Sequence, residues 1–265
     1  MRKDQAIVVP PQGGKMIFKQ SRFSHLAPVS FRCLVAGRTG SGKSSAMYSM
    51  VTDLYKNCFK HIIIVSRTAR LDHTYLQLKD WAEKHLKQDD RMKRFVFTHP
   101  DEEKLMEIFN EHAAQVAKEK LQRKEDHSCE PLSSCLWIFD DLSDSPALRQ
   151  RNESTLNKLF TLGRHSGQSV ICLVHQLSAV SPLIRKNASM LLVFKISNRK
   201  EMEMLETEYA HLVGGTEVFR EIYNMAVGKG APPYTFLTIL PHEQDEKKMF
   251  LARFDQRLVV ELDSD

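Results

Sequence analysis

The sequence predicts an α/β fold in which a mostly parallel central sheet is flanked by helices. Apolar runs typical of strands buried on both faces alternate along the chain with stretches of helical periodicity. These runs are Phe31–Ala36, His61–Ser66, Leu136–Phe139, Ser169–Val174 and Leu191–Ile196. The length of 265 residues and the 42% hydrophobic content suit one large domain. We expect an N-terminal arm at 1–30 and one α/β domain at 31–265, with a core at 31–201 and a C-terminal extension at 202–265.

Composition restricts the compartment and the partners. The formal net charge is +5 and the isoelectric point is about 8.9, a mild basic excess that is compatible with a nucleic-acid partner. The five cysteines contain no C-x-x-C pair, and three lie in or beside apolar runs, which indicates buried free thiols in a reducing compartment. The 11 histidines lack ligand spacing, so we do not expect zinc. Without a signal-peptide core or a membrane-length apolar run, we expect an intracellular, soluble protein.

A glycine-rich turn follows the first apolar run and leads into a helix that opens near Lys43. It fits G-x-x-x-x-G-K-S/T without a mismatch, the Walker A motif of a phosphate-binding loop. The backbone amides of such a loop and the helix N-terminus form an anion cradle. Lys43 would reach the β- and γ-phosphates, and Ser44 would ligate the Mg²⁺ of the nucleotide. The predicted nucleotide-binding residues are Gly37, Arg38, Thr39, Gly40, Ser41, Gly42, Lys43, Ser44 and Ser45.

Two adjacent carboxylates, Asp140 and Asp141, end the apolar run Leu136–Phe139. Ligands of parallel α/β sheets bind at the carboxyl ends of the strands, where the phosphate loop also lies. We therefore expect Asp140 to hold the Mg²⁺ through its water shell. Asp141 would accept a proton from the attacking water or orient it.

The order of the motifs favours one subclass of P-loop nucleoside triphosphatases. Two strand candidates, His61–Ser66 and Phe95–Thr98, lie between the strand of the phosphate loop and the strand that carries the two aspartates. This leaves room for a strand inserted between the two motif strands in the sheet, as in ATPases that use an additional catalytic acid. We therefore predict a RecA-like P-loop NTPase fold of this additional-strand type.

Two further polar residues stand at candidate site positions. Gln176 follows the strand Ser169–Val174, where an amide could contact the γ-phosphate and the lytic water, although a strand-end residue in solvent is the alternative. Arg164 lies on a short turn before that strand. It could reach the γ-phosphate of a neighbouring subunit, or it could be an exposed arginine in an ion pair.

With these stretches in place, the chain resembles the FtsK–HerA superfamily of DNA-pumping ATPases. It is most similar to the genome-packaging branch of large eukaryotic DNA viruses, virophages and Maverick-type elements. The segments that carry the resemblance are GRTGSGKSS at Gly37–Ser45, IFDDL at Ile138–Leu142, LFTLGRHSGQSVICLVHQ at Leu159–Gln176 and PLIRKNASMLLVFKISNRKE at Pro182–Glu201. The resemblance covers about Phe31–Glu201.

The resemblance implies roles for the site residues. The catalytic set would be Lys43, Asp141, Gln176 and Arg164, with Ser44 and Asp140 at the metal. Many members of the superfamily carry Glu where Asp141 stands, so the lytic water must lie closer here or be reached through another water. Relatives often have a hydroxyl residue in place of His175.

The resemblance also implies a motor. A hexameric ring would hydrolyse ATP with Mg²⁺ at its subunit interfaces and thread double-stranded DNA through a central pore. Capsid or portal proteins are further expected partners, and the expected location is the virus assembly site, or the virion itself. Charge alone suggests DNA contacts, against the alternative of a solvated basic face. The candidates are Arg185, Lys186, Lys195, Arg199 and Lys200.

Other functions remain open or are excluded by motifs. A small-molecule or nucleotide kinase would also have a phosphate loop, but would need an acceptor site and an arginine-rich lid. A ring scaffold with DNA-independent ATPase activity is the second alternative. A GTPase would carry N-K-x-D, which Asn198–Glu201 lacks. The tripeptide Ser166–Gln168 follows the aspartate-bearing strand, whereas the signature of an ABC-type ATPase precedes it.

Overall fold

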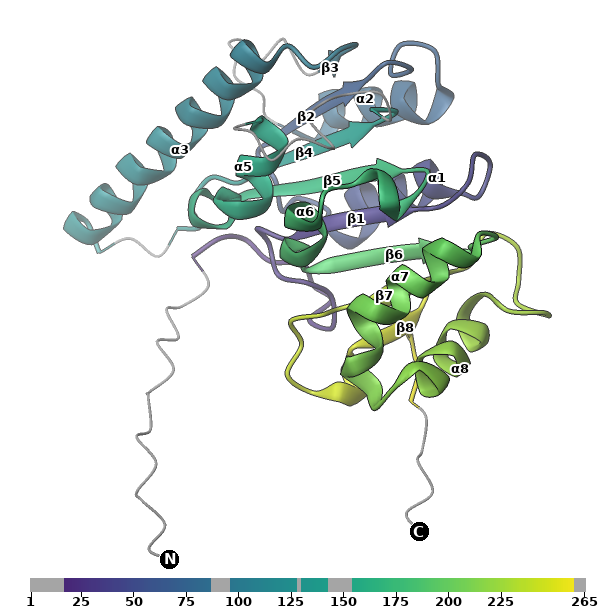
Figure 1. Cartoon of the computed structure of the whole chain (residues 1–265). Coiled ribbons are helices and arrows are strands. Elements are labelled where there is room, and N and C mark those ends of the chain that lie inside the picture. The colour runs from purple at the N-terminus through teal and green to yellow at the C-terminus, as the bar shows by residue number, and fades with distance from the viewer. Residues whose placement is uncertain (1–16, 87–95, 128–129, 143–153, 260–265) are drawn as a thin grey trace, which may run out of the picture.

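A single mixed sheet forms the centre of the protein (Figure 1). The computed structural model describes residues 17–86, 96–127, 130–142 and 154–259, and within these ranges the sheet has nine strands in the order β3-β2-β4-β5-β1-β6-β7-β8-β9. The strands are β1 Arg32–Ala36, β2 His61–Ser66, β3 Val96–Phe97, β4 Cys135–Asp140, β5 Gln168–Val174, β6 Met190–Phe194, β7 Phe236–Ile239, β8 Phe250–Ala252 and β9 Gln256–Arg257. From β3 to β6 neighbouring strands are parallel, and from β6 to β9 they are antiparallel. The predicted mostly parallel α/β architecture is confirmed.

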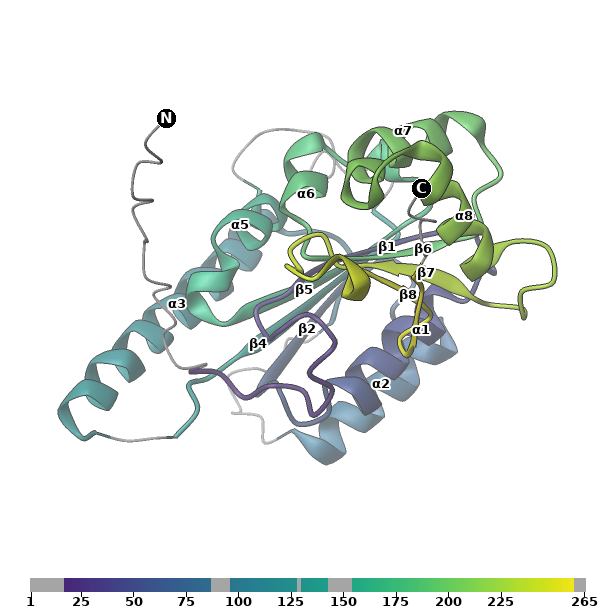
Figure 2. The same ribbon diagram turned by 90° about the horizontal axis from the view of Figure 1, so that it is seen from below.

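Helices cover both faces of the sheet (Figures 1 and 2). The described helices are α1 Lys43–Ser49, α2 His73–His85, α3 Glu102–Glu125, α5 Thr155–Thr161, α6 Pro182–Asn187, α7 Arg199–Tyr209 and α8 Thr216–Val227. Figure 2, which looks along the sheet, shows α1 and α2 on one face and the other five on the opposite face. None of the helices in the described ranges combines the length and apolar composition needed to cross a membrane.

Side-chain caps fix where several helices begin. The carboxylate of Asp72 accepts a hydrogen bond from the Thr74 amide at 2.7 Å, and the Ser154 hydroxyl accepts one from the Asn157 amide at 3.2 Å. Such caps satisfy backbone donors that have no partner inside the helix. Helix α7 begins at Arg199, because the Asn198 side chain accepts a hydrogen bond from the Lys200 amide at 3.0 Å.

Two apolar cores lie on the two faces of the sheet, as the alternation of side chains along a strand requires. In β4, Trp137 and Phe139 pack with residues of α3 and α5, whereas Leu136 and Ile138 pack with residues of α1 and α2. All four side chains are at most 1% exposed. This continuous apolar run is what a parallel strand buried on both faces needs.

The strand inserted between the two motif strands is β5. It pairs with β1 on one side and with β4 on the other. The inserted strand therefore comes after the aspartates in the chain, and not from the candidates between the motifs. Those candidates, β2 and β3, lie on the far side of β4 at the edge of the sheet. Strand order in a parallel sheet is set by where each crossover helix packs, which the order of motifs along the chain does not record.

The described part of the predicted arm packs on the rest of the chain. Phe18 is buried and bridges to Leu132, and its ring occupies the space where a side chain on Gly167 would lie. The Tyr55 hydroxyl donates to the carbonyl of Ala27 at 2.7 Å. Residues 17–31 thus pack along the amino-terminal ends of the central strands. The predicted domain division at residue 30 stays a prediction.

Candidate nucleotide-binding site

The phosphate loop connects β1 to α1 at the carboxyl end of the sheet. Its first residue, Gly37, still extends the sheet, because its amide donates to the Val174 carbonyl at 3.1 Å. Gly42 has φ of +101°, a left-handed conformation that strains any residue with a side chain. A Cβ on Gly37 would lie 2.7 Å from Cβ of Phe194. The loop therefore requires glycine at both positions, and its amides line the surface at the start of α1.

Lys43 lies over this loop and is buried, with 8% of its surface exposed. Its Nζ donates to the carbonyls of Gly37 at 2.7 Å and Arg38 at 3.0 Å. Burial lowers the pKa of Lys43, and the nearby Asp140 carboxylate acts in the opposite direction. An ammonium held between loop carbonyls is placed to meet the oxygens of a phosphate bound by the loop amides. The buried hydroxyl of Ser41 has no hydrogen-bond partner within the described residues, which leaves it available to such a ligand.

Asp140 ends β4 and is held by two donors. Tyr75 Oη donates to its Oδ2 at 2.6 Å, and the Asp141 amide donates to its Oδ1 at 2.8 Å. Burial raises the pKa of Asp140, while these two hydrogen bonds and Lys43 lower it. With one donor on each oxygen, the carboxylate retains further acceptor capacity. This donor set fits a Mg²⁺ ion that takes one carboxylate, one hydroxyl from Ser44 and phosphate oxygens.

Asp141 leaves the strand in a left-handed conformation, with φ of +55°. Aspartate tolerates this region better than most residues. The chain turns directly after β4. The side chains of Asp140 and Asp141 therefore do not alternate between the two faces of the sheet, as neighbours within a strand do. Both aspartates are half-buried.

Gln176 stands two residues beyond β5, on an exposed surface beside the phosphate loop. A hollow of about 210 Å³ is lined by Gly37, Gln176, Lys195, Asn198 and Glu201 among others. The sequence analysis missed Glu201. This carboxylate is 5% exposed and accepts the amides of Leu177 at 2.8 Å and Ser178 at 3.1 Å. It therefore fixes the turn that carries Gln176, from a position in the first turn of α7.

A second hollow lies on the other side of the phosphate loop. It has a volume of about 300 Å³ and is formed by Arg38, Gly40, Ser41 and the segment from Gly228 to Thr235. Within that segment Tyr234 is 69% exposed and has φ of +62°. A Cβ on Gly42 would lie 3.2 Å from Cβ of Tyr234, so the tyrosine packs directly on the loop. A planar base could lie here, and the sequence analysis did not assign Tyr234 any role.

Arg164 is not brought together with the other predicted site residues. It is exposed in a 3-10 turn, Gly163–Ser166, just before β5 begins at Gln168. The phosphate loop and Gln176 lie at the opposite end of that seven-residue strand, about 20 Å away at the usual rise per residue. Arg164 therefore cannot reach a nucleotide on its own phosphate loop.

The candidate DNA contacts divide into three groups. Arg185 was a wrong candidate, because it is 9% exposed and pairs with Glu208 at 2.7 Å while donating to backbone carbonyls of Leu177 and Val180. Lys195 lines both hollows beside the phosphate loop. The others, Lys186, Arg199 and Lys200, are exposed, and Arg199 pairs with Glu203 at 2.6 Å.

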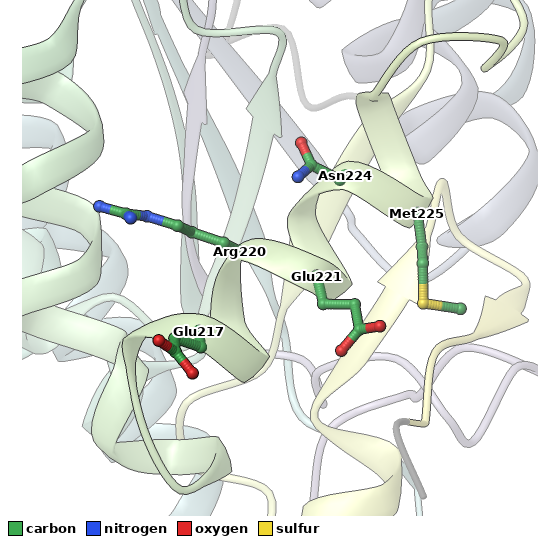
Figure 3. Close-up of a pocket in the computed structure, with 5 residues that line it drawn as sticks. All are labelled: Glu217, Arg220, Glu221, Asn224 and Met225. Carbon is green, nitrogen blue, oxygen red and sulfur yellow. The ribbon is translucent and has the colours of Figure 1, made fainter.

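The wide hollow on α8 is a different kind of surface (Figure 3). Its volume is about 580 Å³, and all its lining residues, Glu217, Arg220, Glu221, Asn224 and Met225, come from one helix. Figure 3 shows Arg220 extended away from Glu221, and this arginine pairs with Glu206 at 2.5 Å. Because two of its five lining residues are glutamates and Arg220 is already paired, this hollow does not suit a phosphate.

Comparison with protein families identifies the chain. Residues 18–227 match the family described as Poxvirus A32 protein. The chain belongs to this family. The match includes the phosphate loop, the two aspartates, Arg164 and Gln176, and it confirms the predicted membership of the viral genome-packaging branch. No curated protein matches the chain.

Solved structures share the fold at low sequence identity. One is the genome packaging NTPase B204 from Sulfolobus turreted icosahedral virus 2 in complex with AMP, with 14% identity, a TM-score of 0.53 and coverage of 84% of this chain and 96% of that chain. The conjugation coupling protein TcpA of pCW3 with ATPγS has 17% identity and a TM-score of 0.52, covering 81% and 58%. EssC (ATPases 2 and 3) from Geobacillus thermodenitrificans has 15% identity and a TM-score of 0.51, covering 89% and 41%. The fold of this A32-family chain is thus the P-loop NTPase fold.

Proposed function

We propose that this A32-family chain is an ATPase that drives double-stranded DNA into a viral capsid. One arrangement carries the proposal: Lys43 and Asp140 lie at the carboxyl ends of β1 and β4, and Gln176 follows the strand between them. Membership of the A32 family supports the packaging role. The similar B204 fold, described as that of a genome packaging NTPase and solved with AMP, supports the use of an adenine nucleotide.

The chain would hold ATP by its phosphates and its base. The phosphate oxygens accept hydrogen bonds from the loop amides, from Lys43 and from the Ser41 hydroxyl. The base lies against Tyr234 in the neighbouring hollow. Ser44 and Asp140 would hold Mg²⁺, which supplies positive charge that stabilises the phosphates during transfer. Thr39 and Ser45 complete the loop and the first turn of α1.

Hydrolysis requires a water aligned with the γ-phosphate. Asp141, redirected by its left-handed conformation, orients this water and accepts its proton. Gln176 hydrogen-bonds the γ-phosphate from the adjacent strand end. Glu201 keeps the turn of Gln176 fixed by accepting two backbone amides. The Gln176 side chain therefore need not be ordered at the moment of reaction.

The position of Arg164 supports action between subunits. Because it lies at the opposite end of β5 from the phosphate loop, it meets a phosphate only on another copy of the chain. A head-to-tail arrangement of this kind closes into a ring when the rotation permits. We propose a hexameric ring with DNA in its pore, contacted through the phosphate backbone by Lys186, Arg199 and Lys200. Capsid or portal proteins would dock the ring at the virus assembly site.

The proposal is tested by steady-state ATP hydrolysis with and without long double-stranded DNA. The wild-type chain should hydrolyse ATP faster with DNA, and Lys43→Ala should abolish both rates. The matched control Lys79→Ala changes an exposed lysine that pairs with Glu83 on α2, and should leave both rates unchanged. Hydrolysis indifferent to DNA would instead favour a ring scaffold, and turnover that needs a small phosphate acceptor would favour a kinase.

A further inference from the structure

A basic hollow of about 470 Å³ opens at the amino-terminal ends of the central strands, opposite the phosphate loop. Its polar lining includes Arg32, Arg164, Ser189, His242 and Glu243. The apolar wall is the segment from Leu26 to Phe31, which packs on the strand ends. Arg32 comes from the first residue of β1, Arg164 from the turn before β5, and His242 from the segment after β7.

Arg32 is the unusual member of this group. It is 8% exposed, and its Nε is buried without a hydrogen-bond partner among the described residues. Its backbone is held by Ser189, because its amide donates to Ser189 Oγ at 2.9 Å and its carbonyl accepts the Ser189 amide at 2.8 Å. A buried guanidinium with an unpaired donor is costly. Such a group in a rigid strand is expected where a ligand supplies the missing acceptor.

The cationic groups around the hollow repel one another. Burial and the neighbouring Arg164 both lower the pKa of Arg32. Burial, Arg32 and Arg164 lower the pKa of His242. The hollow thus gathers two arginines with His242 and His25, and the His25 Nε2 lies 2.8 Å from the Phe254 carbonyl oxygen.

The carboxylate of the hollow does not neutralise the arginines. Glu243 Oε1 accepts the backbone amides of Gln244 at 2.9 Å and Asp245 at 3.3 Å. Among the described residues, neither Arg32 nor Arg164 forms an ion pair with an acidic side chain. The only side-chain bond shown for Arg164 runs from its Nε to Nε2 of His165 at 3.2 Å.

We propose that this hollow binds the terminal phosphates of a nucleotide held by a second copy of the chain, with Arg32 acting beside Arg164. The inference rests on the proposed ATPase function and adds a second arginine and a defined pocket to it. Two forked guanidinium groups match the oxygens of a phosphate. The geometry supplies the partner, because the phosphate loop and the hollow lie at opposite ends of the same strands. When two copies associate head to tail, the hollow of one copy therefore faces the phosphate loop of the next.

The test uses mixed rings and measures ATP hydrolysis. Arg32→Met removes the charge but keeps an unbranched side chain, and alone it should lower the rate by about tenfold or more. Lys43→Ala alone should be inactive. Mixing the two variants should restore activity, because some interfaces then combine an intact phosphate loop with an intact hollow. A mixture of Arg32→Met with Arg164→Ala should stay as slow as Arg32→Met alone, since neither protein has a complete hollow.

Controls separate folding from function. Arg220→Gln, which changes an arginine outside the hollow, should keep the wild-type rate. If Arg32→Met melts at a lower temperature than the wild type, the experiment is repeated with Arg32→Lys. This variant keeps the positive charge and loses only the forked guanidinium group. That variant should also be slow alone and recover with Lys43→Ala.

Three results would overturn the inference while leaving the ATPase proposal intact. The first is wild-type hydrolysis in both Arg32 variants. The second is a loss of activity that mixing with Lys43→Ala does not repair, which would place Arg32 in a role within its own chain. The third is a loss of DNA affinity with DNA-free hydrolysis unchanged, which would assign the hollow to DNA phosphates. Absence of hydrolysis in the wild type would instead contradict the proposed function itself.

Discussion

The Tyr75 hydroxyl donates a 2.6 Å hydrogen bond to Oδ2 of Asp140 and so ties helix α2 to the end of β4. Tyr75 is 1% exposed, and burial together with the Asp140 carboxylate raises its pKa, so that it remains a donor near neutral pH. The aspartate is thereby held in one orientation before any ligand arrives. Such preorganisation spares the site the cost of ordering a metal ligand.

Replacing Tyr75 with Phe should slow ATP hydrolysis by about tenfold. The change keeps the packed ring and removes the donor, so the Asp140 carboxylate loses orientation and its pKa rises further. The apparent affinity for Mg²⁺, measured from the dependence of the rate on magnesium concentration, should fall. Tyr48→Phe on α1 provides a matched loss of a hydroxyl and should leave this dependence unchanged. An unaltered magnesium dependence in Tyr75→Phe would show that the bond is only structural.

Replacing Glu201 with Gln should lower kcat more than it changes KM for ATP. The Leu177 amide bonds to Oε2 and the Ser178 amide to Oε1, so glutamine would place an NH₂ donor against one of these two amides. The turn after Gln176 would then lose its fixed geometry, although the phosphate loop stays intact. Glu203→Gln changes an exposed acid on the same helix and serves as the comparison. Equal kinetics for the two variants would contradict a positioning role for Glu201.

Replacing Tyr234 with Ala should weaken ATP binding by about tenfold, the usual effect of losing one base-stacking ring. Tyr234→Phe keeps the ring and should bind as the wild type does. Tripolyphosphate competes only for the phosphate loop, so its affinity should be the same in all three proteins. Fluorescent-nucleotide displacement measures these affinities. If Tyr234→Ala bound ATP normally, the base would lie outside this hollow.

Acid should destabilise the fold through His112 on α3. Burial lowers the pKa of this side chain to about 4, with His61 and Lys60 acting in the same direction and Glu119 and the Ser166 backbone opposing them. Because the unfolded chain protonates this histidine near pH 6.5, it binds more protons than the folded chain between pH 6.5 and 4. Stability is therefore lost as the pH falls through this window.

The expected loss from this group is about 2 kcal/mol between pH 7.5 and 5. Urea unfolding at the two pH values measures it, and His112→Gln should show a smaller difference than the wild type. An identical pH dependence in the variant would assign the acid sensitivity to other groups.

Much of the fold and part of the site could be predicted from the sequence. Apolar runs such as His61–Ser66 became strands with the same bounds, because a strand buried on both faces needs apolar residues throughout. The phosphate loop was predictable because its glycines and Lys43 are required at fixed spacing. The roles of Gln176 and Arg164 remain predictions.

Contacts between distant segments could not be read from the chain. The position of β5 between β1 and β4 depends on where the helices pack. The residues around Arg185 in the sequence do not indicate that it is buried in an ion pair with Glu208. Arg32 reads as an isolated charge before an apolar run. Only the fold shows that it shares a hollow with Arg164 and His242.

The most direct test of the central claim is displacement of a triplex-forming strand from double-stranded DNA. Movement of the motor along the duplex strips off the third strand, and a fluorescent label on that strand reports its release. With ATP the wild-type chain should displace the strand, whereas Lys43→Ala, Asp141→Asn or a non-hydrolysable ATP analogue should leave it bound. ATP hydrolysis stimulated by the same DNA without any displacement would contradict translocation.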